Sequence, residues 1–198
     1  MALLLITAGC NKSNTGNSVS QHVFPNIPGD SWQYLVKDTT IQGSVDSGSI
    51  QYNVDVLIVD TVNWPNGITA AIWQFRYPGW VDTNFVYQTG DTIRFLDRSK
   101  TYIVRQYIIP FTLGSSWPYI PGISNVTVVG QNNVVVGNNV FTGAWQIYGS
   151  AGMPDAIFTI DEWFEDNIGF VRLYLNPSGE LIFTKHIQDW SLVSYKIK

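Results

Sequence analysis

The chain has 198 residues, of which 45% are hydrophobic and 13% are charged, with a net charge of −4. This composition supports one large or two small folded domains and argues against a disordered chain. There is no run of Lys and Arg, so a surface that follows nucleic-acid phosphates is disfavoured and we expect no nucleic acid among the partners. The single cysteine excludes an internal disulfide and a Cys-rich zinc site.

The first residues form a short apolar block, 3–8, which leads through Gly9 to the single cysteine, Cys10. Small side chains before a cysteine let the backbone enter a protease groove, while an apolar block can lie in a membrane. Residues 11–21 are polar and rich in Asn and Ser, which is typical of a flexible tether. The segment Thr7–Cys10 resembles the lipobox of bacterial lipoproteins.

The resemblance to bacterial lipoproteins implies that the peptide before Cys10 is removed and that the Cys10 sulfur is diacylated. We therefore expect residues 1–9 to be a signal peptide, shortened relative to the family, and residues 10–23 to be the lipidated cysteine and its tether. Two or three acyl chains suffice for stable membrane anchoring. In Bacteroidota lipoproteins an acidic cluster after the cysteine marks export to the cell surface. Residues 11–20 contain no acid, so we expect an outer-membrane anchor that faces the periplasm.

The rest of the chain reads as β-strands separated by turns. Residues 49–59 carry apolar side chains at every second position, which predicts a half-buried strand about 36 Å long. Such a length favours a strongly curved sheet or barrel over a compact sandwich. Asn66-Gly67 then predicts a hairpin into a strand over 68–77. Further strands are expected over 85–88, 91–96, 101–109, 126–129, 134–136, 140–148, 156–164, 169–175, 181–188 and 190–197.

Two segments share the pattern P-x-x-x-G-x-S-W-x-Y, namely Pro25–Tyr34 and Pro110–Tyr119. Weaker similarities follow at the same order along the chain. Trp73-Gln74 matches Trp145-Gln146, and Ile93-Arg94-Phe95 matches Val171-Arg172-Leu173.

We interpret these matches as a duplicated β-module, with pseudo-repeats over 24–105 and 109–198 that together build one domain over 24–198. The alternative is a recurring turn, in which Gly makes the bend and Trp packs beneath it. The predicted fold is all-β: a strongly curved, mostly antiparallel sheet or half-barrel of roughly ten strands, from two related halves.

The order of motifs resembles that of small β-rich envelope lipoproteins common in Bacteroidota. Their pattern is a lipobox, a Pro…Gly…Trp motif and a late aromatic-Gly strand. Here these are Thr7–Cys10, then Pro25–Trp32 with its copy Pro110–Trp117, and then residues 163–171. The resemblance implies an envelope location and a β-rich fold, and the family offers no catalytic residues to transfer.

The densest acidic segment is Asp161-Glu162 followed by Glu165-Asp166. Such a cluster could hold Ca²⁺ or supply an acid and a base. However, a strand would point Asp161 and Glu162 to opposite faces, and no EF-hand loop is present. We therefore interpret the segment as a solvated strand end and hairpin, with a hydrolase centred on it as a minor alternative.

The remaining reactive side chains do not form a recognisable catalytic motif. His22 lies in the tether and His186 on an expected strand, so we expect no metal site and no cofactor. Ser115 and Ser116 lie in the repeated turn, where a structural role explains them, and no Gly-x-Ser-x-Gly motif is present. We expect no catalytic residues and a protein that is not an enzyme.

Aromatic residues are unusually frequent, with eight Trp, ten Tyr and ten Phe. Most should fill the core of a curved β-domain, but some could stack on sugars or receive acyl chains. The candidate ligand-binding residues are Trp73, Tyr77, Trp80, Trp117, Tyr119 and Trp145. We expect a non-catalytic, lipid-anchored envelope lipoprotein that binds an apolar or amphipathic ligand, such as a lipid, inside the sheet. The alternative is a structural or interaction subunit of an envelope complex that contacts glycans.

Overall fold

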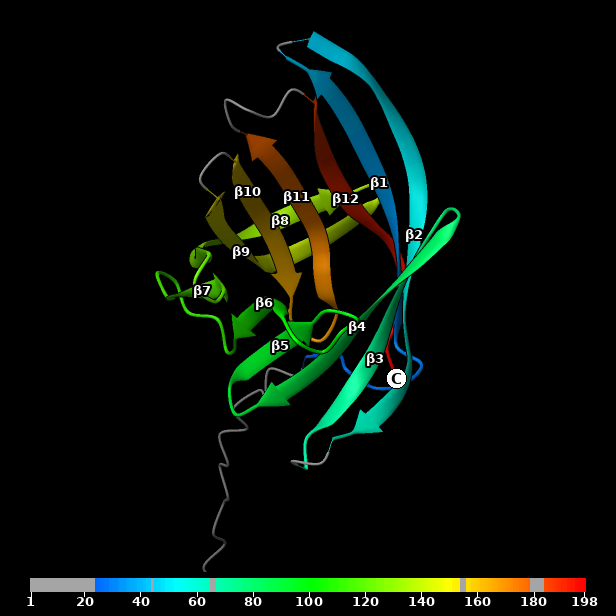
Figure 1. Cartoon of the computed structure of the whole chain (residues 1–198), viewed down its shortest axis with the longest axis vertical. Helices are drawn as coiled ribbons and strands as arrows, with labels where there is room; N and C mark the ends of the chain where they lie inside the picture. The colour runs from blue at the N-terminus through cyan, green and yellow to red at the C-terminus, as the bar shows by residue number, and fades with distance from the viewer. Residues whose placement is uncertain (1–23, 44, 65–66, 154–155, 179–183) are drawn as a thin grey trace, which may run out of the picture.

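The computed structural model describes residues 24–43, 45–64, 67–153, 156–178 and 184–198, and Figure 1 shows their arrangement. The predictions for residues 1–9, Cys10, the tether and His22 fall outside these described residues. Among the described residues, no helix is long and apolar enough to span a membrane. The strands are β1 (Ser31–Gln42), β2 (Val45–Asn63), β3 (Thr69–Tyr77), β4 (Trp80–Thr89), β5 (Thr92–Leu96), β6 (Ile103–Ile108), β7 (Ser116–Ile120), β8 (Ser124–Val136), β9 (Asn139–Met153), β10 (Ala156–Glu165), β11 (Gly169–Ser178) and β12 (Thr184–Lys196).

All twelve strands belong to one antiparallel sheet with the order β6-β5-β4-β3-β2-β1-β12-β11-β10-β9-β8-β7. Every strand pairs with its neighbours in sequence, except that β6 and β7 form the two edges and β1 pairs with β12. The sheet curls until these two edges approach each other, which gives a nearly closed barrel (Figure 1). The predicted all-β, strongly curved antiparallel fold is confirmed.

Strand boundaries differ from the expected ones where polar residues occur within a strand. Neither β1 nor β7 was expected, because Asp38 interrupts the alternation of β1 and β7 lies in a stretch that contains Pro and Gly. β8 replaces two expected strands, since the polar residues 130–133 form bulges in its pairing with β9 instead of a turn. β12 likewise runs through Asp189, which faces Arg172 of the neighbouring strand β11.

The sequence matches fall on corresponding strands of the two halves. The repeated Pro–Tyr motif leads into β1 in one half and into β7 in the other. Trp73 lies on β3 and Trp145 on β9, so each is on the third strand of its half. An up-and-down arrangement gives any two six-strand halves the same order, so the duplication itself stays a prediction.

The tryptophans of the repeated motif tie the two halves together. Trp32 donates its indole N–H to the carbonyl of Ile168 at 2.6 Å, in the other half of the chain. Trp117 donates to the carbonyl of Gln106 at 2.8 Å, again in the other half. Both rings are 3% exposed, and Trp32 stacks on Trp73 with ring centroids 4.8 Å apart. The motif therefore supplies anchors between the halves as well as turns.

Side chains close the seam between the edge strands β6 and β7. The amide of Gln106 on β6 donates to the carbonyl of Pro118 on β7 at 2.7 Å, next to the Trp117 bond to the Gln106 carbonyl. Both strands are short, with six and five residues, so few backbone groups remain at the edges.

Candidate ligand cavity and its polar groups

A cavity of about 250 Å³ lies on the concave side of the sheet. The sequence positions its walls through the alternation of strands: Trp73, Phe75 and Tyr77 follow every second position of β3 and all line it. From the far side, Phe170 of β11 and Trp190 of β12 complete the aromatic lining. The cavity is thus built by both halves of the chain.

An outer groove of about 500 Å³ adjoins this cavity. Tyr77 and Gln188 line both spaces, so the groove and the cavity meet at these two residues. Its outer wall includes Ile50 and Trp80, whose side chains are 65% and 56% exposed. Together they form an apolar rim at the mouth of the barrel.

The pair Tyr77 and Trp80 results from local turn chemistry. Gly79 adopts a φ of 89°, a left-handed conformation that favours glycine and allows a tight turn. The turn places Tyr77 of β3 directly opposite Trp80 of β4. Their rings stack with centroids 3.9 Å apart and an interplanar angle of 2°. One face of Trp80 is thereby covered and the side chain still remains largely exposed.

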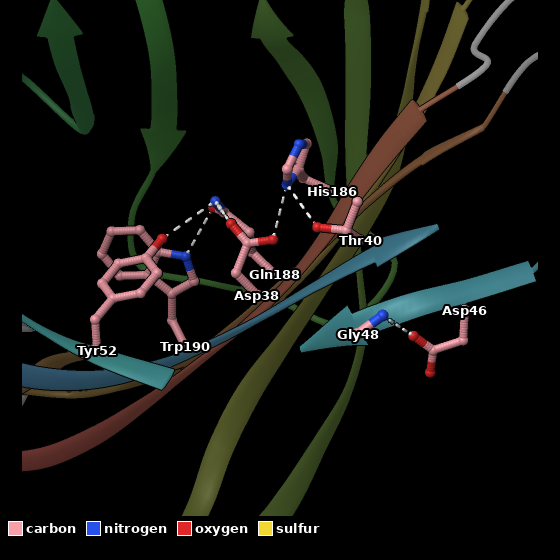
Figure 2. Close-up of polar contacts among 8 residues, drawn as sticks. All are labelled: Asp38, Thr40, Asp46, Gly48, Tyr52, His186, Gln188 and Trp190. Atoms are coloured by element: carbon pink, nitrogen blue, oxygen red, sulfur yellow. Dashed lines mark hydrogen bonds and ion pairs between the residues drawn. The ribbon is translucent and has the colours of Figure 1, made fainter. Parts of the chain in front are cut away.

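A polar network fixes the inner side of the mouth, as Figure 2 shows. The buried carboxylate of Asp38 accepts a hydrogen bond from the Gln188 amide at 3.0 Å. The Gln188 amide oxygen accepts one from the Trp190 indole at 3.2 Å, and the Tyr52 hydroxyl lies 3.5 Å from the Gln188 nitrogen. These bonds hold Gln188 at the junction of cavity and groove.

His186 completes this network at the surface. Its Nδ1 lies 3.0 Å from Asp38 and 3.5 Å from the Thr40 hydroxyl (Figure 2), and its side chain is 58% exposed. A catalytic triad needs the hydroxyl and the carboxylate on opposite ring nitrogens. Here both meet the same nitrogen, so the arrangement is not that of an activated Thr nucleophile.

Arg105 brings a positive charge to the inner part of the cavity. Its guanidinium lies over the rings of Phe95, Phe170 and Phe75, at 4.3, 5.3 and 5.8 Å from their centroids. Cross-strand pairing places Arg105 level with Phe95 and Val86. Arg105 therefore lies deeper in the barrel than Tyr77 and Trp80 at the mouth. Cation–π contacts of this kind hold a guanidinium without neutralising it.

Glu162 corrects the interpretation of the acidic segment as solvated. Its side chain is 0% exposed, and its two oxygens accept hydrogen bonds from Tyr107 at 2.9 Å and Tyr119 at 2.8 Å. Asp161 points to the other face, as expected for a strand, and accepts a bond from Gln146 at 2.8 Å. The sequence could not reveal that tyrosines from both edge strands β6 and β7 surround Glu162.

The buried cluster shifts the acidity of its members. Burial raises the pKa of Glu162 above its usual value, and Arg105 opposes that rise. Burial also raises the pKa of Tyr107 and of Tyr119, so both hydroxyls remain donors. Burial by itself would lower the pKa of Arg105, but Tyr107, Tyr119 and Glu162 raise it, so Arg105 stays charged.

The structure brings together half of the candidate ligand-binding residues. Trp73 and Tyr77 line the cavity, and Trp80 lines the outer groove. Trp117 packs on Phe111, Trp145 lies 6.5 Å from the same ring, and Tyr119 bonds to Glu162. None of these last three lines the cavity or groove. A role in ligand binding stays a prediction for all six residues.

The sequence did not single out Asp38, Asn84, Arg105 and Gln188, although all four line the cavity or the groove. A sequence feature that could have identified two of them is a polar residue two positions before an inward aromatic residue on the same strand, as in Arg105-x-Tyr107 and Gln188-x-Trp190.

The other reactive residues have structural partners. Ser115 donates to the Thr112 carbonyl at 2.6 Å and Ser116 to the Val126 carbonyl at 2.9 Å, both beside the turn before β7. Within the described ranges, no group of three or more His, Cys, Asp or Glu residues could hold a metal ion. The absence of catalysis stays a prediction.

Comparison with known proteins assigns neither a family nor a function to this chain. No family model and no curated protein matches the sequence. Among solved structures, the chain is similar to a protein of Bacteroides fragilis described as a candidate exported protein with a YmcC-like fold. The two chains are 12% identical, the match covers 87% of this chain and 98% of the other, and the TM-score is 0.40. The function is therefore argued from the cavity.

Proposed function

We propose that the protein is a non-catalytic binding protein of the bacterial envelope, which holds an amphipathic ligand in its barrel. The observation that carries this proposal is the aromatic cavity that adjoins the outer groove at Tyr77 and Gln188. Small-molecule sites typically have volumes of roughly 300 to 1,000 Å³ and aromatic walls with a few fixed polar groups. The groove has this size, and the cavity supplies the polar groups.

The size of the two spaces limits how a ligand can bind. At about 250 Å³, the inner cavity accommodates only one end of a lipid-sized molecule. The other end must then lie in the outer groove against Ile50 and Trp80. A single-chain amphiphile fits this description better than a bulky or branched lipid.

Three alternatives remain. A glycan could stack on the exposed face of Trp80 and bond to Asp38 and Gln188. A structural subunit would be favoured by a filled interior, whereas this interior contains a cavity. A hydrolase is supported least, because Glu162 is fully buried and does not line the cavity.

Native mass spectrometry of the full chain carrying Cys10→Ser, purified from cells without detergent, tests the proposal. We expect a stoichiometric adduct that organic solvent extracts. Leu175→Trp should remove the adduct or weaken binding about tenfold, because Leu175 lines the cavity and pairs with Gln188 at its mouth. The matched control Val135→Trp, on an exposed strand position, should bind like the wild type.

The binding proposal fails if the chain is recovered bare and binds neither fatty acids nor fatty alcohols when these are added. Equal binding by the wild type and Leu175→Trp would place the ligand outside the cavity.

The anchor is tested separately by fractionating cells that express the wild type or Cys10→Ser. We propose that Cys10 is lipidated, on the resemblance of Thr7–Cys10 to a lipobox. The wild type should then partition with membranes and incorporate labelled palmitate. Cys10→Ser should be soluble and unlabelled, and its retention on the membrane would contradict the lipoprotein assignment.

A further inference from the structure

We infer that the ligand carries an anionic head group, which Arg105 and Asn84 bind at the inner end of the cavity while the apolar part extends outward past Tyr77. This inference rests on the proposed function and deepens it by naming the chemical class of the ligand. Two observations support it: which polar groups of the cavity already have hydrogen-bond partners, and where polar and apolar side chains lie between its inner end and its mouth.

Arg105 has donors available for a ligand. A guanidinium carries five N–H donors. Among the described residues, no carboxylate lies within 4.0 Å of it, and the contacts that position it are the rings of Phe75, Phe95 and Phe170. Its polar neighbours are the Tyr107 and Tyr119 hydroxyls and the Glu162 carboxyl, which lies beyond ion-pair distance, and together they leave part of the donor capacity of Arg105 unused. A planar fork of donors held on aromatic rings suits a carboxylate or a phosphate.

Asn84 offers a second unused group in the same cavity. Its side chain is buried, lines the cavity and makes no hydrogen bond to any described residue. On β4, Asn84 lies opposite Trp73 and two positions before Val86. Val86 pairs with Phe95 of β5, and Phe95 pairs in turn with Arg105 of β6. Its amide opens into the cavity and is not one of the buried side-chain groups that lack a partner, so a ligand that accepts its N–H bond takes the place of water there.

The carboxylates near the cavity already have donors. Asp38 accepts bonds from Gln188 and contacts His186, and both oxygens of Glu162 are bonded to tyrosines. Asp82 lines the cavity opposite Phe75, between the mouth and Asn84, and accepts the Thr83 backbone N–H at 2.8 Å. An anion is therefore best placed beyond Asp82, at Arg105, and Asp82 opposes its entry.

The distribution of polar and apolar side chains along the site is the reverse of the usual one, in which charges face solvent and apolar groups are buried. The inner end carries the partly buried Arg105, and the exposed rim carries the apolar side chains of Ile50 and Trp80 beside the polar Gln51. An amphiphile with its head inward and its chain outward satisfies both ends, because the chain removes the exposed rim from water. A ligand of the opposite orientation would leave Arg105 and Asn84 without partners.

Isothermal titration of the full chain carrying Cys10→Ser with three probes of equal chain length tests the inference. The probes are dodecanoic acid, dodecyl phosphate and dodecanol, each below its solubility limit. Because charge-assisted hydrogen bonds contribute strongly, the two anions should bind about tenfold or more tighter than the alcohol. The ratio of the affinities for the acid and for the phosphate shows whether the site prefers a carboxylate or a phosphate head group.

Substitutions test whether Arg105 causes the preference for anionic probes over the alcohol. Arg105→Met keeps the apolar bulk against the rings and should bind all three probes with similar, weak affinity. Arg94→Met is the matched control, because Arg94 lies on the neighbouring strand β5, contacts Tyr87 and does not line the cavity, so it should keep the full preference. Asp82→Asn should tighten binding of the acid and leave binding of the alcohol unchanged.

Equal affinity of the wild type for acid and alcohol overturns the inference and leaves the proposed function standing, whether or not Arg105→Met folds. A preference that persists in a folded Arg105→Met also overturns it. Binding of none of the probes counts against the proposed function itself.

Discussion

Replacing Glu162 with Leu is expected to lower the free energy of unfolding by about 3 kcal/mol or more. The substitution leaves the Tyr107 and Tyr119 hydroxyls without their acceptor and leaves Arg105 without the nearest negative charge. It also releases the contact between β10 and the two edge strands of the seam. Urea denaturation followed by tryptophan fluorescence measures the change.

The control for this substitution is Asp161→Leu, at the adjacent position on the outer face, where about 1 kcal/mol or less is expected. Equal losses for the two variants would show that the buried cluster is no more important than a surface position.

The pH dependence of Glu162 has a definite sign. Because burial raises its pKa above the ordinary 4.5, the folded chain binds this proton more tightly than the unfolded chain. Its contribution to stability is therefore present at low pH and is lost as pH rises from 4.5 through the raised pKa. The difference in unfolding free energy between wild type and Glu162→Gln should fall over that window, and a rise would contradict the assignment.

Trp32→Ala and Trp117→Ala are each expected to cost about 3 to 5 kcal/mol of stability. Each substitution opens a large cavity beside a stacked ring and leaves a carbonyl of the other half, at Ile168 or Gln106, without its indole donor. Trp32→Phe and Trp117→Phe keep most of the ring and should cost about 1 to 3 kcal/mol. Thermal and urea denaturation of the four variants measure these effects.

Trp80→Ala is the matched control, because Trp80 is largely exposed and donates to neither half, and about 1 kcal/mol or less is expected. If Trp80→Ala destabilised the chain as much as Trp32→Ala, the tryptophans of the motif would have no special role in joining the halves. A loss at Trp32 without one at Trp117 would show that only one copy of the motif anchors the barrel.

The sequence by itself determined the all-β class, because alternation and turn residues are local properties. Residues 49–59 show this most clearly, since the predicted inward side chains lie on the concave side of β2 and Val54, Val56 and Ile58 are buried. Tyr77 and Trp80 were likewise recognisable as candidate ligand-binding aromatics, and the structure stacks their rings across one turn. The repeated Trp motif leads into the first strand of each half, although neither β1 nor β7 was itself predicted.

The tertiary structure alone decided which inward polar residues are satisfied and where the ligand cavity lies. Asp38 interrupts the alternation of β1, and only the distant Gln188 and His186 explain its burial. Glu162 reads as a solvated acid until the edge strands bring two tyrosine hydroxyls to it. The physical reason is that burial of a polar group is stable only with partners. In a sheet whose halves are joined by the pairing of β1 with β12 and whose edges β6 and β7 meet, those partners come from strands far apart in sequence.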